Sequence, residues 1–398
     1  MMNHIQISNK ADCTGCRACE QLCPQGCISI LADDEGFLSP AVNEDQCIEC
    51  GVCLRQCPQR QEFRLWQPLS EPVVYAAKLK DRETLHKSSS GGAFSALAQY
   101  VLARGGVVFG AVFDEHLVAK HVYSETWEGI APMRGSKYVQ SDTGNTFGQA
   151  KHFLDQGRWV LYTGCPCQIA GLHSFLGKQY DTLLAVDLIC HGVPSPLLFG
   201  KYINWLGTKH KGKLTAYDFR NKDVNGWSVS VKYEGNSNSR PFTRYINQVN
   251  WDPYYRGFVE RKTLRMCCYE CHYACERRVG DITIADYWGL DKAHPDFMDS
   301  EGVSLLFTNN LHGARCFDNV RAHLEVHLSD FEKATVMQTN LSMPSGQPSI
   351  RKGIYENIRS LSFDKYASRY LSPKGIAFIK LCIPRPIKRV IKSLLGRT

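Results

Sequence analysis

Eight of the 18 cysteines fall into two runs with the same spacing, at residues 13–24 and 47–58. Each run reads Cys-x-x-Cys-x-x-Cys-x-x-x-Cys-Pro. Three thiolates set two residues apart can wrap a loop around an iron–sulfur cluster, while the proline ends the turn and lets the fourth cysteine point elsewhere. The chemistry predicted from these residues is one-electron transfer.

The alternative for these cysteines is a pair of structural zinc sites, because zinc also uses Cys-x-x-Cys pairs. Two such pairs satisfy a zinc ion, so zinc leaves the third closely spaced cysteine and the proline of each run unexplained. The pattern therefore favours two [4Fe-4S] clusters.

Over about the first 60 residues the chain resembles the bacterial ferredoxins that carry two [4Fe-4S] clusters. In that arrangement the first three cysteines of a run bind one cluster and the fourth crosses to the other. The resemblance gives one cluster the ligands Cys13, Cys16, Cys19 and Cys57, and the second cluster Cys23, Cys47, Cys50 and Cys53. Cys27 lies beyond the motif, and we expect it to be a packed thiol.

Length and composition bound the rest of the chain. Its 398 residues leave room for a small module and a larger domain. The sequence has neither a signal-peptide pattern nor a run of 18 apolar residues, so we expect a cytoplasmic protein whose cysteines bind metal and do not form disulfides. The net charge of +8 falls largely on residues 374–398, so no nucleic-acid surface is indicated for the main body.

Periodicity predicts an α+β and α/β organisation in three parts: a small βαβ-type ferredoxin domain, a larger α/β domain with a β-hairpin insertion, and a helical C-terminus. The parts span residues 1–62, 72–330 and 331–398, with a polar linker before residue 72. Apolar runs predict strands at 73–78, 107–113, 159–164, 183–189 and 281–290, helices at 92–104 and 169–176, and the hairpin-like insertion within 215–245. Strands alternating with helices favour partly parallel pairing.

Three cysteine-bearing segments follow predicted strands of the larger domain. They are TGCPCQIAGL with Cys165 and Cys167, DLICHGVPSP with Cys190, and the group at 267–275. A turn after a strand exposes its thiol at the carboxyl edge of the sheet, where α/β folds bind ligands. From the residues alone, a third metal centre and a set of buried, inert cysteines both remain open.

The segment SSSGGAF at 88–94 places hydroxyls and flexible amides at the start of a predicted helix. Such a turn can bind a phosphate or pyrophosphate, although a serine that simply caps the helix fits the composition better. Lys137 is a second candidate for phosphate contact, and its alternative is a solvated lysine.

From about Cys13 to Leu290 the chain resembles the family of beta subunits of coenzyme F420 hydrogenases and dehydrogenases. The resemblance rests on SSSGGAFSALA, RGSKYVQS, YTGCPCQIAGL, DLICHGVPSP, FRNKDVNGWSVSV, LRMCCYEC and DITIADYWGL, which follow the two-cluster module in this order. Members of that family are flavoproteins that bind FAD and iron–sulfur clusters, and they pass electrons between one-electron carriers and a two-electron acceptor.

The resemblance also implies specific site residues. A third [4Fe-4S] cluster would have Cys167, Cys190, Cys268 and Cys271 as ligands, with Cys165, Cys267 and Cys275 outside that set. The serine–glycine turn would hold the flavin pyrophosphate through Ser89, Ser90, Gly91 and Gly92, with Lys137 nearby.

We therefore predict an iron–sulfur flavoprotein oxidoreductase that connects its clusters, through FAD, to a small-molecule hydride donor or acceptor. The aromatic run at 251–258 is expected to line the substrate pocket. His191 and Asp286 are candidate proton donors, and a structural role is equally open for each.

Two other functions follow from the same residues. The chain would be an electron-transfer subunit without its own substrate if it docks on a hydrogenase, a dehydrogenase or another redox protein such as ferredoxin. Cys165 with Cys167, or Cys267 with Cys268, would be a redox-active thiol pair, although neither spacing matches the usual Cys-x-x-Cys motif.

The C-terminal tail has a basic amphipathic pattern. Its apolar residues Ile387, Val390, Ile391, Leu394 and Leu395 fall on one helical face, with basic residues around the other. Such a helix lies on the inner membrane surface as a peripheral contact or packs against the protein's own body, and the pattern leaves both open.

Overall fold

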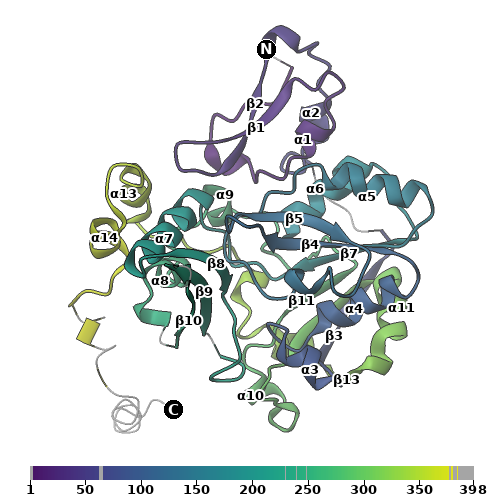
Figure 1. Ribbon diagram of the computed structural model, residues 1–398. Helices are drawn as coiled ribbons and strands as arrows, with labels where there is room; N and C mark the ends of the chain where they lie inside the picture. The colour runs from purple at the N-terminus through teal and green to yellow at the C-terminus, as the bar shows by residue number, and fades with distance from the viewer. Residues whose placement is uncertain are drawn as a thin grey trace.

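The computed structural model describes residues 3–61, 66–228, 230–238, 240–247, 249–375, 378–379 and 383. An eight-stranded mixed sheet lies at the centre (Figure 1). In spatial order its strands are β13 (Leu324–Ser329), β3 (Pro68–Leu79), β12 (Ser304–Asn310), β11 (Ile282–Asp286), β7 (Leu183–Leu188), β6 (Val160–Gly164), β4 (Val107–Phe113) and β5 (Ala119–Ser124).

Five strands of this sheet end at the same edge. Strands β4, β6, β7 and β11 are parallel neighbours. Strand β3 runs in the same direction, because β3 and β11 both pair antiparallel with β12. The prediction of a partly parallel α/β domain is confirmed, and the turns after these strands meet at one carboxyl edge.

Helices cover both faces of the sheet. One apolar layer joins α4 (Ala93–Leu102) and α11 (Leu311–Val320) to the sheet through residues such as Val108, Leu161 and Leu184. The opposite layer joins α5 (Thr146–Asp155) and α6 (Pro166–Leu176) through Val107, Val160 and Leu183. Successive residues of each strand therefore face different layers, which is why the central strands are almost continuously apolar.

A smaller antiparallel sheet packs beside the large one. It contains β8 (Lys213–Asp218), β9 (Val231–Ser237) and β10 (Arg240–Ile246), in the order β10-β9-β8. Its aromatic core is completed by α7 (Pro196–Lys209), α8 (Pro253–Val259), α13 (Arg351–Glu356) and α14 (Phe363–Tyr366). The predicted hairpin insertion is thus a three-stranded sheet, and helices from beyond residue 331 pack against it.

Short helices complete the larger part of the chain. They are α3 (Arg82–His86), α9 (Met266–Tyr269), α10 (Leu290–Ala293) and α12 (Phe331–Thr335). None of the helices within the described ranges is long and apolar enough to cross a membrane. The amphipathic tail at 387–395 lies outside the described residues, so its membrane contact stays a prediction.

The N-terminal module differs from the predicted βαβ unit. Its elements are α1 (Ala18–Gln21), β1 (Ile28–Ala32), β2 (Leu38–Val42) and α2 (Val52–Arg55). Strands β1 and β2 are antiparallel and consecutive, so the described residues form a hairpin between two short helices and do not show the predicted βαβ order. A turn of five residues is too short to reverse the chain twice, as a parallel connection requires.

The predicted linker before residue 72 is also wrong in its second half, because β3 already begins at Pro68. Proline lacks an N–H but is tolerated at the first residue of a strand, so Pro68 does not prevent this pairing. The proposed boundaries at 62, 72 and 330 stay predictions.

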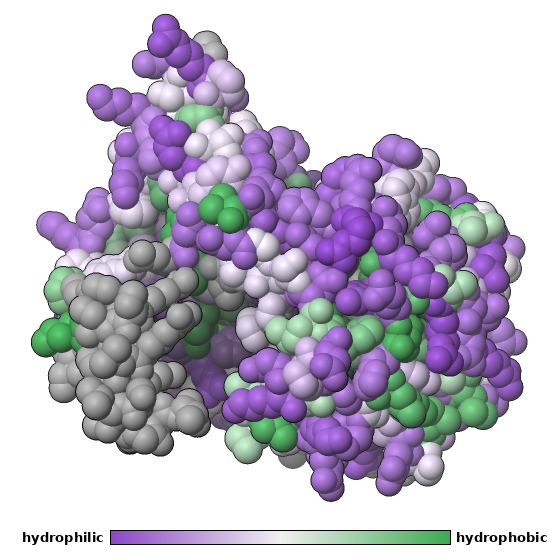
Figure 2. Space-filling model, turned by 90° about the horizontal axis from the view of Figure 1, so that it is seen from below, coloured by the Kyte–Doolittle hydropathy of each residue, from purple (hydrophilic) through white to green (hydrophobic). Residues whose placement is uncertain are grey.

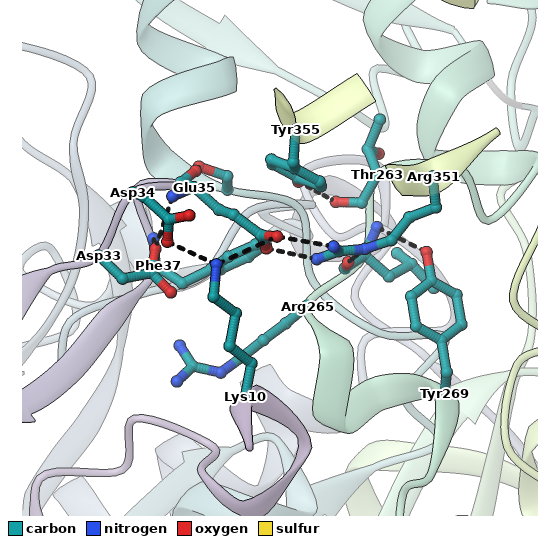
Figure 3. A network of polar contacts seen from close by, with 12 residues as sticks. Lys10, Asp33, Asp34, Glu35, Phe37, Thr263, Arg265, Tyr269, Arg351 and Tyr355 are labelled. Atoms are coloured by element: carbon teal, nitrogen blue, oxygen red, sulfur yellow. Dashed lines mark hydrogen bonds and ion pairs between the residues drawn. The ribbon is translucent and has the colours of Figure 1, made fainter. Parts of the chain in front are cut away.

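A buried ion pair fastens the N-terminal module to the rest of the chain (Figure 3). Arg351 on α13 donates to both carboxylate oxygens of Glu35, at 2.8 and 2.5 Å, and both residues are buried. Lys10 lies 3.3 Å from the same carboxylate. Arg265 donates to the carbonyl oxygens of Cys13 and Leu38, both at 2.8 Å. These contacts fix the first cysteine loop against the larger body.

Replacing Arg351 by methionine removes both charged hydrogen bonds to the buried Glu35 carboxylate and leaves it only the contact with Lys10. We expect Arg351→Met to lower the free energy of unfolding by about 3–5 kcal/mol, measured by urea denaturation of protein purified without oxygen. Lys352→Met is the matched control, because Lys352 lies on the same helix in an exposed ion pair with Glu356. The control should change the free energy of unfolding by less than about 1 kcal/mol. Equal losses in the two variants would contradict the role given to Arg351.

Candidate active site

Four cysteines of the N-terminal module lie together next to the larger body, and we call them the inner thiols. They are Cys13, Cys16, Cys19 and Cys57. Burial, together with the negative field of Cys13 and Cys57, raises the pKa of Cys16 to about 11. Thiolates this buried and this close to one another need positive charge among them, so their environment fits the predicted cluster.

The other cysteines of the module surround a small cavity at its far side, and we call them the outer thiols. They are Cys23, Cys47, Cys50 and Cys53. Cys27 lines the same cavity, and its sulfur lies 3.4 Å from the sulfur of Cys23. Cys27 is buried, which agrees with the expected packed thiol. The side chains it packs against include the predicted cluster ligands of the outer thiols.

A third group, which we call the central thiols, forms below the inner thiols. Its members are Cys165, Cys167, Cys190, Cys268 and Cys271. Cys165 directly follows β6 and Cys190 follows β7, and their sulfurs are 3.8 Å apart. Burial and the field of Cys190 and Cys268 raise the pKa of Cys271 to about 12. The structure brings the four predicted ligands together and adds Cys165.

The two remaining extra cysteines differ in position. Cys267 is buried beside Cys268, at the edge of the central thiols. Cys275 donates its S–H to the carbonyl oxygens of His272 and Arg277. Cys275 is therefore engaged with backbone and stands apart from the group.

No three His, Cys, Asp or Glu side chains of the described residues converge on one point as the ligands of a single metal ion do. A mononuclear zinc site requires such convergence. In a [4Fe-4S] cluster each thiolate binds a different iron, so grouped but separated sulfurs are the arrangement it needs.

The inner and central thiols share an apolar wall. Cys16, Cys167 and Cys271 pack in one cluster with the buried side chains of α6. A Cβ atom added to Gly171 on α6 would lie 3.0 Å from the sulfur of Cys16, so a larger residue there would have to push Cys16 away by a few tenths of an ångström. Tyr273 also touches both groups, and its hydroxyl donates to the carbonyl of Pro58 at 3.0 Å.

A large cavity of about 1370 Å³ lies at the carboxyl edge of the sheet. Figure 2 shows the molecule from below, where its surface is deeply hollowed. The walls of the cavity include the serine–glycine turn, the aromatic side chains of Trp251, Tyr255 and Phe258, and two central thiols, Cys165 and Cys190. Single-ligand pockets usually have volumes of about 300–1,000 Å³, so this one has room for two ligands.

No serine of the serine–glycine turn caps the helix that follows it. Gly92 is the N-cap of α4 with a φ of 81°, and no side chain accepts from the first amides. Ser88 donates to the carbonyl of Thr84, and Ser90 donates to that of Val303. The alternative that a serine caps α4 is therefore wrong, and the first N–H groups of the helix stay open to an anionic ligand.

Lys137 is not the solvated lysine of the alternative interpretation. Its ammonium donates to the carbonyl oxygens of Pro132, Arg134 and Gly135 at 2.6–3.1 Å, and burial lowers its pKa to about 8. All three of its protons are thus engaged with backbone. Arg134, which also lines the cavity, has a buried Nη2 without a hydrogen-bond partner in the described structure.

The two predicted proton donors both line the cavity. The Nε2 atom of His191 lies 3.2 Å from the carbonyl oxygen of Phe258, and burial lowers the pKa of the imidazole. Asp286 ends β11 and accepts a hydrogen bond of 2.5 Å from Arg220. The structure thus places both residues as expected, but their roles as proton donors stay predictions.

Sequence reasoning missed several polar residues of the cavity, four of which matter most for its charge and hydrogen bonding. They are His121, Gln168, Arg134 and Arg220. His121 is buried between Ser141 and the carbonyl of Thr163, and burial lowers its pKa to about 4. The one available signal was the segment FRNKDVNGWSVSV, which places Arg220 just after a strand.

The central thiols can be tested by iron content. Protein purified without oxygen should contain about 12 irons, and Cys190→Ser should reduce this to about 8, because one cluster loses a ligand. Cys275→Ser is the matched control and should keep about 12 irons, since Cys275 stands apart from the group. An unchanged iron content in Cys190→Ser would remove Cys190 from the ligand set.

Three family models match this chain. The 4Fe-4S dicluster domain matches residues 12–60, and the N-terminal and C-terminal models of the coenzyme F420 hydrogenase/dehydrogenase beta subunit match residues 74–146 and 157–334.

Two known proteins are similar to it. A subunit of the F(420)H(2) dehydrogenase of Methanosarcina mazei is 24% identical over 188 residues, which are 45% of this chain and 53% of that protein. The match thus spans about half of that relative's length. A chain in the solved F420-reducing [NiFe] hydrogenase complex from Methanosarcina barkeri aligns at 18% identity and a TM-score of 0.41, over 74% of this chain and 93% of its own. On the family models, the chain belongs to the family of coenzyme F420 hydrogenase/dehydrogenase beta subunits, with a 4Fe-4S dicluster domain at its N-terminus.

Proposed function

We propose that this chain is an iron–sulfur flavoprotein oxidoreductase that connects three [4Fe-4S] clusters and FAD to a hydride-exchanging small molecule. The observation that carries the proposal is the position of Cys165 and Cys190, which belong to the central thiols and also line the large cavity. A site suited to one-electron transfer and a site large enough for a flavin therefore share a wall.

The three thiol groups form a continuous series. The outer thiols lie at the far side of the module, the inner thiols lie against α6, and the central thiols follow at the sheet edge. Neighbouring groups are close enough to feel each other's charge, because Cys167 lies in the field of Cys16 and Cys57 in that of Cys53.

An FAD bound in the cavity would supply hydride chemistry together with one-electron exchange. The residues available for it are the uncapped start of α4 and Arg134 for the pyrophosphate, and the rings of Tyr255 and Phe258 for excluding water. Burial lowers the pKa of His121 to about 4, so its imidazole is neutral at pH 7, and burial also lowers the pKa of His191. The identity of the hydride acceptor as coenzyme F420 is part of the proposal and follows the family name.

A second candidate function is that of an electron-transfer subunit in a larger cytoplasmic assembly. The side chain of Ile48, next to Cys47 at the outer thiols, is 60% exposed. It offers an apolar contact point for a redox protein. The name of the similar dehydrogenase chain describes it as a subunit. The two candidates are compatible if the partner delivers electrons to the outer thiols.

The deciding experiment measures flavin and electron flow in protein purified without oxygen. About 12 irons with one released FAD are expected, and chemically reduced ferredoxin should reduce that flavin. Cys190→Ser should keep its flavin but lose this reduction. Absence of flavin from the intact protein would overturn the flavoenzyme proposal, and unchanged reduction in the variant would overturn the proposed route.

The flavin site is tested separately at Ser89, which lines the cavity at the start of α4. A leucine there fills the space in front of the helix amides, so Ser89→Leu should reduce bound flavin by more than about tenfold, as expected when charged hydrogen bonds are lost. Its iron content should not change. Ser360→Leu is the surface control, because Ser360 is exposed and distant from the cavity walls. Full flavin in Ser89→Leu would place the pyrophosphate elsewhere.

A further inference from the structure

Arg220 is a buried cation at the cavity with three of its five N–H groups unused. Its side chain is 2% exposed. The Nη1 atom donates to Asp286 at 2.5 Å and to the hydroxyl of Tyr138 at 3.2 Å. The Nε and Nη2 atoms are buried and have no hydrogen-bond partner among the residues that the structure describes.

The two free nitrogens lie on one side of the guanidinium. Nη2 is the terminal nitrogen on the same side as the Nε hydrogen, so these atoms present two parallel N–H groups. This fork matches the two oxygens of a carboxylate or phosphate. A buried charge with unmet donors costs free energy, which a ligand oxyanion at this point would recover.

The surroundings of Arg220 also favour an anion. The rings of Trp227 and Trp288 lie 5.8 and 5.7 Å from its guanidinium and fix the plane of the fork. The hydroxyl of Ser228, on the cavity wall, is likewise buried and without a partner in the described part of the chain.

The charges that face the cavity are unequal. Arg134, Lys137 and Arg220 supply three cations, and Asp286 supplies one carboxylate. Burial lowers the pKa of His121 to about 4, so this imidazole adds no charge at pH 7. A cavity with an excess of positive charge attracts anionic ligands.

The fork is separate from the serine–glycine turn. Asp286 on β11 lies opposite Ser304 on β12, and Ser304 lies opposite Ala77 on β3, the strand before the turn. The turn itself packs on β12, because Ser90 donates to the carbonyl of Val303 and Gly91 adjoins the backbone nitrogen of Ser304. One strand spacing, about 5 Å, separates Ser304 from Asp286, and the two sets of donors come from different elements, the start of α4 and the segment after β8. The cavity thus offers two anion sites, and its volume suits two ligands.

We propose that Arg220 and Ser228 bind a carboxylate or phosphate group of the second ligand, the hydride-exchanging substrate. This inference rests on the proposed function, because it assigns the serine–glycine turn to the flavin. Asp286 is then a positioning residue, which orients the fork by holding Nη1.

The test uses the intact protein and two probes, inorganic phosphate and malonate, titrated by calorimetry. Arg220→Lys keeps the positive charge beside Asp286 but removes the fork. We expect the intact protein to bind one of the probes, and Arg220→Lys to bind it about 10- to 100-fold more weakly, with unchanged iron and flavin. The preferred probe tells a phosphate from a carboxylate. Arg82→Lys is the matched control, because Arg82 forms a bidentate pair with Asp299 away from the cavity, and its probe affinity should not change.

The inference is overturned if Arg220→Lys binds the probe as tightly as the intact protein does, or if the intact protein binds neither probe at tens of millimolar. It is also overturned if Arg220→Lys loses its flavin, because the fork would then belong to the flavin. If Arg220→Lys does not fold, the double variant Arg220→Gln/Asp286→Asn removes both charges together and must show the same loss of probe binding. Titration of flavin-free protein separates this inference from the proposed function, because probe binding to the fork does not require flavin.

Discussion

The close approach of Cys16 to helix α6 is the constraint on which the arrangement of the thiol groups depends. Gly171 leaves just enough space for the sulfur, and Cys16, Cys167 and Cys271 then share one apolar cluster. Several independent contacts hold the module in this position, among them the Glu35–Arg351 pair and the hydrogen bonds from Arg265. The module is therefore a fixed part of the molecule, not a tethered carrier.

The second organising feature is the common edge at which five strands end. It places the serine–glycine turn after β3, Cys165 after β6, Cys190 after β7 and Asp286 at the end of β11 around one cavity. These residues are far apart in the sequence, and parallel pairing is what gathers them. The antiparallel strand β12 lies between β11 and β3 and so separates Asp286 from the end of β3.

Sequence reasoning succeeded where the signal is local. The cysteine runs have a spacing that few other sites share, and strands such as β4 and β7 are buried on both faces, so their apolar runs are continuous. It failed where the role of a side chain depends on a partner far away in the sequence. The hydroxyls of Ser88 and Ser90 and the ammonium of Lys137 are taken by backbone carbonyls that no local pattern reveals. Arg220 donates to Asp286 and Tyr138, which lie 66 and 82 residues away in the sequence.

The opening of the central thiols onto the cavity has a consequence for the protein's durability. Cys165 and Cys190 are reachable by small oxidants that diffuse into the empty cavity, whereas the apolar wall around Cys167 and Cys271 shields the opposite side. Oxidation of exposed thiolates, once it passes the sulfenic acid stage, is largely irreversible. A ligand that fills the cavity excludes water and oxygen from this side. If Cys165 and Cys190 hold the proposed cluster, a ligand in the cavity would also shield that cluster from air.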